Sequence, residues 1–469
     1  MNIEYNRQRV LFDRPLIERY NQSGPRYTSY PTAPHLHEGF GPAEFAQEVA
    51  RSNGEVPQRP LSLYVHIPFC DTVCYYCACN KVVTPDRSRA ERYLQSLLRE
   101  VELLGALFGR ERPVLQLHLG GGTPTYLDTA QLDRLQSALR THFHLLEGDA
   151  GEYGIEVDPR EMPVGAIRAL RQLGFNRLSL GVQDLDEKVQ KAVNRVQSLA
   201  LNQRVVEEAR QAGFPSINLD LIYGLPLQSE HSFQQTLEVV VRELNPDRLA
   251  VFNYAHLPQY FMPQRRINPD QLPSPEEKLR ILERTIQFLT ASGYLYIGMD
   301  HFAKPDDELA VAQRQGVLHR NFQGYTTHGN CDLLGLGSSS ISQIGRIYAQ
   351  NLKEVEPYYQ RVDAGELAIF RGLELNSDDL IRREVIMRLI CDFQLDREAI
   401  EKQFNLSFPL YFQQEMESIQ RMLGEGLLEE EGPLLRVLPA GRLLIRNICM
   451  VFDWYFANAQ QKKVFSRTI

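Results

Sequence analysis

Residues 61–79 read LSLYVHIPFCDTVCYYCAC, so four of the seven cysteines of the chain follow an apolar run within ten residues. The first three cysteines have the spacing C-x3-C-x2-C, and the fourth follows as C-x-C. Thiolates packed this closely repel one another unless a cation, a cluster or oxidation to disulfides neutralises their charge. The loop is therefore compatible with an iron–sulfur cluster, a zinc site or disulfide bonds.

The rest of the chain helps to choose among these three sites. Structural zinc usually takes two separated ligand pairs, and no second cysteine pair or His-x3-His follows the loop in the sequence. A cubane cluster normally takes four thiolates. A loop that offers three at this spacing leaves one iron open to an exogenous ligand, which favours a catalytic cluster.

Length and charge set limits on the class of protein. A chain of 469 residues can bury a large core and is expected to form more than one domain. Its net charge of −8 argues against nucleic acid as the main partner. We find no signal-peptide pattern at the N-terminus and no apolar window of membrane-spanning length. An odd number of cysteines without a secretory signal predicts a cytoplasmic protein.

From residue 61 onward, strand-like and helix-like segments alternate. Strands alternating with helices predict a parallel sheet, so we expect an α/β fold with a partial barrel of six βα units. We predict three domains: an N-terminal arm over 1–60, the barrel and its extension over 61–350, and a small, mostly helical, winged-helix-like domain over 351–469. The predicted strands are 61–67, 114–119, 153–157, 177–182, 217–223 and 248–254, and the predicted helices between them are 87–107, 129–143, 164–173, 201–212 and 232–244.

Polar and glycine residues follow each predicted strand. In parallel barrels the active site forms at the carboxyl ends of the strands, from the loops that follow them. A carboxylate at any one of these ends can also be explained as a helix cap, but the repetition in every unit predicts one active-site mouth. The segments concerned are His66 with the cysteines, Gly120-Gly121-Gly122-Thr123-Pro124, Glu156-Val157-Asp158, Gln183-Asp184, Asp220 and Asn253-Tyr254-Ala255-His256.

These features resemble the radical S-adenosylmethionine superfamily, through the cysteine spacing and the glycine-rich end of the second strand. Within it, the chain is similar to the oxygen-independent coproporphyrinogen III oxidases of haem biosynthesis. That likeness extends over nearly the whole chain. It is most specific in the arm SGPRYTSYPTA at 23–33, in the C-x-C that ends at Cys79, and in LIRNICM at 444–450.

The resemblance implies a radical-SAM barrel and a particular reaction. Cys70, Cys74 and Cys77 would each ligate one iron of a [4Fe–4S] cluster, and S-adenosylmethionine would chelate the fourth iron. A 5′-deoxyadenosyl radical would then take hydrogen from a propionate, and loss of CO2 and one electron would leave a vinyl group. Reaction on rings A and B converts coproporphyrinogen III to protoporphyrinogen IX. A one-electron donor of the flavodoxin or ferredoxin type and a monomeric state are implied as well.

The resemblance further implies two S-adenosylmethionine molecules per chain. Position 76 is Tyr where the family often has Phe, which keeps an aromatic face. Contacts to the first molecule match Tyr64, Gly121, Glu156 and Ile341, and contacts to the second match Tyr76, Gly122, Thr123, Gln183, Arg195, Asp220 and Ala255.

Three residues have open roles. Cys79 as a fourth ligand would close the open iron, so we expect it near the site as a catalytic residue that handles a proton or hydrogen atom. The alternative is an inert buried thiol. His66 is a candidate hydrogen-bond donor to the site or a core residue, and Arg26 is a candidate for binding substrate propionates.

Other functions remain to be weighed. A related haem chaperone or haem-trafficking protein shares the barrel and the cysteine loop, but as a class it lacks the C-x-C cysteine and the arm. A radical enzyme that opens haem is a second alternative. A structural metal-binding protein is a third, and it leaves the polar strand ends unexplained.

Overall fold

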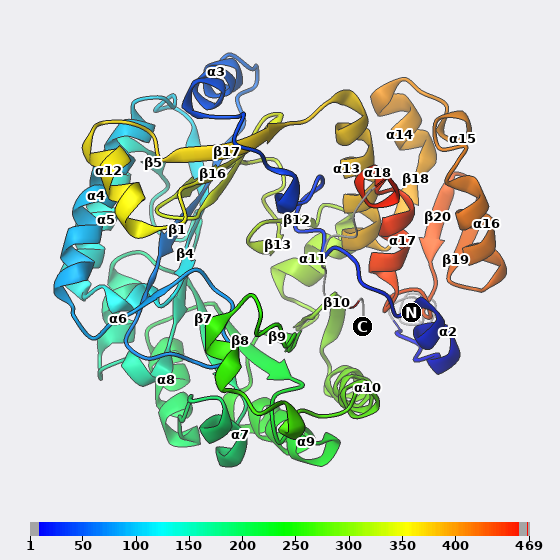
Figure 1. The fold of residues 1–469 in the computed structure, drawn as a ribbon, viewed down its shortest axis with the longest axis horizontal. Coiled ribbons are helices and arrows are strands. Elements are labelled where there is room, and N and C mark those ends of the chain that lie inside the picture. The colour runs from blue at the N-terminus through cyan, green and yellow to red at the C-terminus, as the bar shows by residue number, and fades with distance from the viewer. Residues whose placement is uncertain (1–8, 459–466, 468–469) are drawn as a thin grey trace. The chain divides into compact units, whose positions relative to one another are not determined.

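The computed structural model describes residues 9–458 and 467, and these fall into two compact units. We call one the barrel unit, which comprises Leu36–Ile281 and Asn330–Glu374. We call the other the helical unit, which comprises the described residues of Met1–His35, Leu282–Gly329 and Leu375–Ile469. Figure 1 shows both units along the colour gradient of the chain.

Six parallel strands form the centre of the barrel unit (Figure 1). They pair in sequence order, each parallel to the next, with a register shift near Leu61 in the β1–β4 pair and one between Gly181 and Gln183 in the β7–β8 pair. β1 is buried along almost its whole length, as expected for a parallel strand covered on both faces. The predicted α/β fold with six βα units is therefore confirmed. The strands are β1 (Leu61–Ile67), β4 (Pro113–Gly121), β6 (Glu152–Val157), β7 (Arg177–Gln183), β8 (Ser216–Tyr223) and β9 (Arg248–Asn253).

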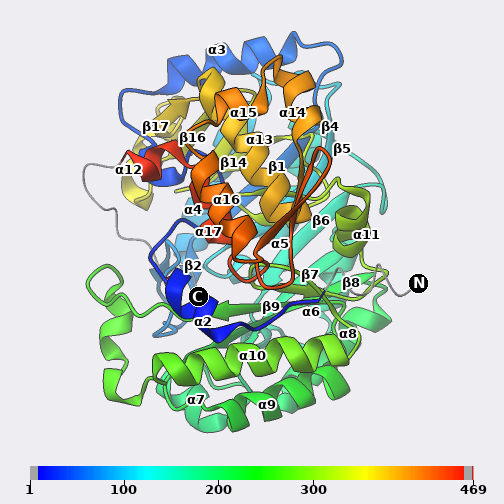
Figure 2. The same cartoon turned by 90° about the vertical axis from the view of Figure 1, so that its right-hand side faces the viewer.

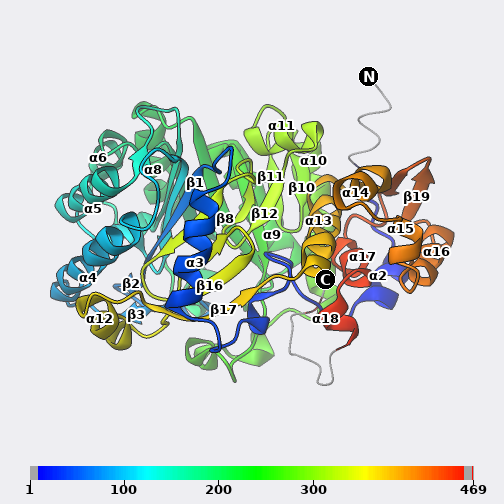
Figure 3. The same cartoon turned by 90° about the horizontal axis from the view of Figure 1, so that it is seen from above.

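Amphipathic helices connect these strands and lie on the outer side of the sheet, as Figure 3 shows for α4, α5, α6 and α8. Side-chain caps fix several starts, because the carboxylate or hydroxyl accepts an otherwise unpaired backbone N–H: Asp128 caps α5, Ser198 caps α8 and Ser229 caps α9. The short α7 was not predicted. The helices are α4 (Ser88–Gly105), α5 (Thr129–His142), α6 (Ala166–Gln172), α7 (Glu187–Ala192), α8 (Leu199–Gln211) and α9 (Glu230–Val239).

A second set of strands extends the sheet beyond β1. β14 (Asp332–Leu336) pairs with β1 in parallel, and β15 (Ile341–Ile344), β16 (Ile347–Asn351) and β17 (Ile369–Glu374) follow as antiparallel strands. The helix α3 (Pro42–Asn53) packs against β15 and β16. This packing makes residues 36–60 part of the barrel unit. The domain boundaries at residues 60 and 350 remain a prediction from the sequence.

The helical unit combines helices with short antiparallel strands. The N-terminal arm is held within it, since Tyr27 donates to Asp453 at 2.9 Å and Arg446 donates to the carbonyls of Gly24 and Pro25. Figure 2 shows α14, α15 and α16 beside α13. Its elements include α2 (Arg14–Tyr20), β10 (Leu295–Gly298), β11 (His301–Ala303), α11 (Glu308–Gln315), β12 (His319–Asn321), β13 (Gly324–Thr326), α13 (Ser377–Asp392), β18 (Gln394–Asp396), α14 (Arg397–Phe404), α15 (Phe408–Tyr411), α16 (Met416–Gly424), β19 (Leu428–Glu431), β20 (Leu434–Val437), α17 (Ile445–Val451) and α18 (Trp454–Ala457), and α10 (Pro275–Ala291) begins in the barrel unit.

The strands β18, β20 and β19 form a small antiparallel sheet in this unit, with α14, α15 and α16 between β18 and β19 along the chain. This arrangement agrees with the predicted small, mostly helical C-terminal domain. None of the helices in the described part of the chain is both long enough and apolar enough to cross a bilayer.

One ion pair fastens the amino end of β14 to the rest of the barrel unit. Arg112 donates to Asp332 at 2.6 Å, and both side chains are almost fully buried. Asp332 also accepts from Ser52 on α3 and from the N–H of Gly345. The pair therefore joins α3, β14 and the loop before β4.

We predict that Asp332→Ala lowers the free energy of unfolding of the barrel unit by about 3–5 kcal/mol, because it leaves Arg112 as a buried cation without its carboxylate. Urea denaturation measures the change. Glu91→Ala removes the exposed pair with Arg134 and should cost no more than about 1 kcal/mol. Equal effects of the two variants would contradict the assignment.

Candidate active site

A cavity of about 180 Å³ lies beside the cysteine loop, at the carboxyl ends of β4, β6, β7 and β8. This is the end of the sheet at which the sequence predicted an active-site mouth. The predicted site residues that line it are Cys70, Cys74, Cys77, Cys79, Tyr76, Gly121, Gly122, Thr123, Glu156, Gln183, Arg195 and Asp220.

Hydrogen bonds to its backbone hold the cysteine loop at its start and further along. At its start, β2 (Phe69–Cys70) pairs in parallel with β3 (Val82–Val83). Further along, the N–H of Tyr75 donates to the carbonyl of Val193 at 2.9 Å, and Gln264 donates to the carbonyl of Tyr76 at 3.0 Å. The loop is therefore anchored to the barrel on two sides.

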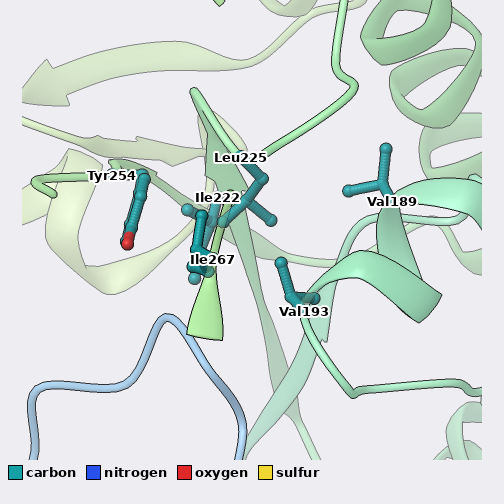
Figure 4. Close-up of a cluster of buried hydrophobic side chains, with 6 residues drawn as sticks. All are labelled: Val189, Val193, Ile222, Leu225, Tyr254 and Ile267. Carbon is teal, nitrogen blue, oxygen red and sulfur yellow. The ribbon is translucent and has the colours of Figure 1, made fainter. Parts of the chain in front are cut away.

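An apolar cluster packs against the same loop, and Figure 4 shows the buried members of this cluster. Tyr75 and Tyr76 are partly buried against this cluster. Their aromatic faces take the loop close to the ends of β8 and β9, which supply part of the cluster. Its buried members are Val189, Val193, Ile222, Leu225, Tyr254 and Ile267.

The glycine-rich end of β4 meets the end of β1 backbone to backbone. The N–H of Gly122 donates to the carbonyl of Ile67, and the N–H of Thr123 donates to that of Phe69, both at 2.8 Å. A Cβ atom at position 122 would lie 2.6 Å from the carbonyl oxygen of Phe69. Gly121 has φ +118°, a region that side chains disfavour. These two positions therefore require glycine.

The cysteines are free thiols that receive donors from the barrel. Thr123 donates to Sγ of Cys70 at 3.6 Å, and Arg160 and Arg195 donate to Sγ of Cys74 at 3.6 and 3.5 Å. Donors of this kind stabilise the thiolate form that binds iron.

No group of three or more His, Cys, Asp or Glu in the described residues is arranged to hold a single metal ion. A cubane cluster takes each thiolate on a different iron. Cysteines that serve it therefore surround a cavity and do not converge on one point. Because Cys70, Cys74 and Cys77 line one cavity, they fit a cluster better than a mononuclear metal.

Asp158 holds the two arginines that reach Cys74. Its carboxylate accepts from Arg160 at 2.6 Å and from Arg195 at 2.8 Å, and Arg195 also donates to the carbonyl of Gly181 at 2.7 Å. Burial would raise the pKa of Asp158, but the two guanidinium groups outweigh burial and lower it. The buried Nε of Arg195 has no hydrogen-bond partner in the structure, so this side chain keeps a donor beside the cavity.

Two further carboxylates face the cavity from β6 and β8. Glu156 accepts from His118 at 3.2 Å and from the N–H of Gly121 at 3.3 Å, and these donors outweigh burial and lower its pKa. Burial, with the nearby charge of Glu156, raises the pKa of Asp220 to about 6. The cavity thus offers acceptors that suit amino and hydroxyl groups of a ligand.

Four predicted residues do not line this cavity. His66 is buried, and its ring contacts the hydroxyl of Tyr64 at 3.1 Å and the carbonyl of Asn80 at 3.0 Å. His66 therefore binds the backbone just after the cysteine loop and does not line the cavity. Ile341 lies on β15. The carbonyl of Ala255 accepts a hydrogen bond from Gln264, which also donates to the carbonyl of Tyr76 in the cysteine loop.

Cys79 lines the cavity and is exposed. Its exposure does not fit the alternative of a buried thiol, and its role in the reaction stays a prediction. Arg26, the candidate for substrate propionates, forms an ion pair with Asp300 in the helical unit.

The structure adds residues to the site that had no role in it from the sequence. Asp158 belonged to a predicted strand end without a role of its own, and Arg160 follows two residues later, so its position shortly after a strand was the available signal. On β7, Ser179, Gly181 and Gln183 face the cavity, while Leu180 and Val182 between them are buried. This period of two indicates one open face of the strand. Lys81, which donates to the carbonyl of Cys77, had no comparable signal.

Comparisons with known proteins agree with this site. The model of the Radical SAM superfamily matches residues 64–240, and that of the HemN C-terminal domain matches residues 375–444. The chain is 55% identical over 460 residues to an oxygen-independent coproporphyrinogen III oxidase of Pseudomonas aeruginosa, covering 98% of this chain and 99% of the relative. It is 54% identical over 462 residues to the protein of the same name from Escherichia coli K12, with 98% and 99% covered.

A solved structure gives the same result. It is the structure of the coproporphyrinogen III oxidase HemN of Escherichia coli, described as a radical SAM enzyme, and its sequence is 53% identical to this chain. The match has a TM-score of 0.90 and covers 95% of this chain and all of the solved one.

We predict that Gly122→Ala destabilises the barrel unit by about 1–3 kcal/mol, because the added methyl group must push apart the ends of β1 and β4. Chemical denaturation measures the loss. Gly424→Ala is the matched control, since a Cβ atom there meets nothing within 4 Å. If Gly122→Ala were as stable as the control, the close backbone contact would not be a constraint.

Proposed function

The chain belongs to the family of oxygen-independent coproporphyrinogen III oxidases, within the radical SAM superfamily, and we propose that the cavity beside the cysteine loop is its active site. It is an oxidoreductase of haem biosynthesis that converts the ring A and ring B propionates of coproporphyrinogen III to vinyl groups, giving protoporphyrinogen IX. The observation that carries this conclusion is the full-length identity of 55% to an oxidase of this name.

Each propionate loses a hydrogen atom, CO2 and one electron when it becomes a vinyl group. One hydrogen atom leaves the β-carbon of the propionate, the bond to the carboxylate breaks to release CO2, and one electron passes to an acceptor. A vinyl double bond remains. Since hydrogen, CO2 and an electron leave separately, the site must keep water from the reacting carbon.

Membership of the superfamily implies a [4Fe–4S] cluster and S-adenosylmethionine. When bound, these groups supply an electron and the radical that takes the hydrogen atom. We assign the three irons held by the protein to Cys70, Cys74 and Cys77. The donors from Thr123, Arg160 and Arg195 to these sulfurs support the assignment.

The chain's own residues would hold the cofactors in place. Arg160 and Arg195 place positive charge beside Cys74, which offsets the charge of the thiolates. Glu156 and Asp220 offer carboxylates to the amino and hydroxyl groups of S-adenosylmethionine. Gly121 and Gly122 let the backbone approach a ligand closely.

We further propose two S-adenosylmethionine molecules per chain, in two adjacent sets of contacts. For the first, Tyr64 on β1 is in register with Gly335 on β14. A Cβ atom added to Gly335 would lie 2.9 Å from the backbone of Ile341. Tyr64 and Ile341 are thus neighbours across the sheet. The second set is Tyr76, Gly122, Thr123, Gln183, Arg195 and Asp220, which line one cavity, with Ala255 joined to the loop through Gln264.

The haem chaperone alternative is not favoured. The chain has Cys79 and the arm that this class lacks, and its matched relatives are named as oxidases over their full length. A flavodoxin- or ferredoxin-type electron donor, a monomeric state and a cytoplasmic location stay predictions from the family.

Anaerobic reconstitution tests the function. The protein is loaded with iron and sulfide and supplied with a reductant, S-adenosylmethionine and coproporphyrinogen III. We expect protoporphyrinogen IX and two molecules of CO2 for each substrate consumed. Stoichiometric haem binding without any vinyl product would favour the chaperone instead.

We predict different results for the cysteines of the loop. Cys70→Ser, Cys74→Ser and Cys77→Ser should each lose most of the bound iron, because serine is a poor ligand for this cluster. Cys79→Ser should keep its iron and the absorbance of the cluster but lose most of the turnover. Iron content and turnover are measured on the same samples. Loss of iron in Cys79→Ser would contradict our assignment of Cys79.

A further inference from the structure

A row of residues in register crosses the sheet of the barrel unit from β1 to β17. Tyr64 on β1 is opposite Gly335 on β14, and the pairing of β14 with β15 brings Gly335 beside Ile341. Ile341 is opposite Gln350 on β16, and Gln350 is opposite Arg371 on β17. Residues directly opposite one another on paired strands point to the same face of a sheet. Arg371 therefore points to the same face as Tyr64.

This is the face of the sheet that lines the cavity. His118 on β4 is in register with Tyr64, and the two rings stack with their centres 6.1 Å apart. His118 contacts the carboxylate of Glu156 at 3.2 Å, and Glu156 lines the cavity. On the opposite face of the extension, Asn351 donates to a buried carboxylate of α4 at 2.6 Å. Arg371 thus lies on the cavity side of the extension.

Arg371 keeps N–H donors that the barrel unit does not use. Its Nε atom donates to Oε1 of Gln350 at 2.7 Å, and Nε2 of Gln350 donates to the carbonyl of Ser339 at 2.9 Å. These two bonds fix the direction of the guanidinium group. Its Nη atoms form no hydrogen bond or ion pair with the described residues. Burial lowers the pKa of Arg371, and the charge of the exposed Glu38 offsets this only in part.

A second cation, Lys353, lies beside Arg371 and next to the cysteine loop. Asn80 follows Cys79 directly, and it donates to the carbonyl of Lys353 at 2.9 Å. Since Cys79 lines the cavity, the backbone of Lys353 borders the rim of the cavity. Desolvation and the nearby charge of Arg371 lower the pKa of Lys353. Among the residues that the structure describes, no carboxylate forms an ion pair with its ammonium group.

Two cations held close together repel each other unless an anion joins them. A carboxylate matches the planar fork of N–H donors of arginine, and lysine adds a point charge. The substrate of the proposed reaction carries propionates besides the two that react. In the cavity, the guanidinium groups of Arg160 and Arg195 are already bound to Asp158.

We propose that Arg371 and Lys353 bind a propionate carboxylate of the porphyrinogen substrate at the rim of the cavity. Both residues belong to the barrel unit, as the cavity does. This inference rests on the proposed function and adds the residues that hold one propionate while another reacts. Because Gln350 orients the guanidinium group before the substrate arrives, less entropy is lost on binding.

The test compares two stable ligands, coproporphyrin III and its tetramethyl ester, which differ only in their carboxylates. Dissociation constants are measured by porphyrin fluorescence for the full chain loaded with its cluster, in one oxygen-free detergent buffer. Arg371→Gln should weaken binding of the free acid by about 10- to 100-fold. Lys353→Gln should weaken it by about 2- to 5-fold, because an exposed charge contributes less. Binding of the ester should change little in either variant.

Arg134→Gln is the matched control, since it removes an exposed pair with Glu91 and should change the binding of neither ligand. Unchanged binding of the acid in both test variants, or equal losses for acid and ester, would overturn the proposal. Where Arg371→Gln does not fold, Arg371→Lys decides, because lysine keeps the charge but not the planar fork. Weaker binding of the acid alone is again the expected result.

The same protein samples separate this inference from the proposed function. If the wild-type protein makes no vinyl product, the proposed function fails. If it does, and both variants bind the acid normally, only this inference fails.

Discussion

Two backbone hydrogen bonds, from Gly122 to Ile67 and from Thr123 to Phe69, join the end of β4 to the start of the cysteine loop. They form only because position 122 has no side chain, since a Cβ atom would lie against the carbonyl of Phe69. The loop leaves β1 next to these bonds, so they set where its sulfurs lie relative to the strand ends. The adjacent Thr123 also donates to Cys70. Placement of the cysteines therefore depends on this contact more than on the loop's own residues.

Electrostatic balance around Asp158 is the second condition for the site. Thiolates, Glu156 and Asp220 bring negative charge to one cavity, and Arg160 and Arg195 bring the positive charge that offsets it. Asp158 binds both arginines and points them at Cys74. In the helical unit, the buried Nε and Nη1 atoms of Arg320 and Arg442 have no hydrogen-bond partner, and the same is true of the Nε atom of Arg195 beside the cavity.

Much of the barrel could be predicted because its strands are local apolar runs. β1 was predicted at its observed limits, and the other five strands agree to within two residues. Very short elements, and contacts between segments far apart in the sequence, were not predictable in this way. The six residues of α7 are too few for a helical period. The packing of α3 on β15 and β16 joins segments nearly three hundred residues apart, which local patterns do not contain. His66 followed the strand-end pattern but turned out to lie behind the cavity, since a residue's position in a strand does not fix what covers it.

Local features of the chain specify the chemistry of this protein. Cysteine spacing, the glycines after the second strand and the full-length family motifs specify a cluster-binding oxidase, because ligand type and spacing are local properties of the chain. Which polar groups share the cavity depends on the fold instead. Asp158 meets Arg195 from another βα unit, and Arg320 and Arg442 lie without a carboxylate partner. Pairing and its absence depend on what the fold brings within hydrogen-bonding distance, and no stretch of sequence records that.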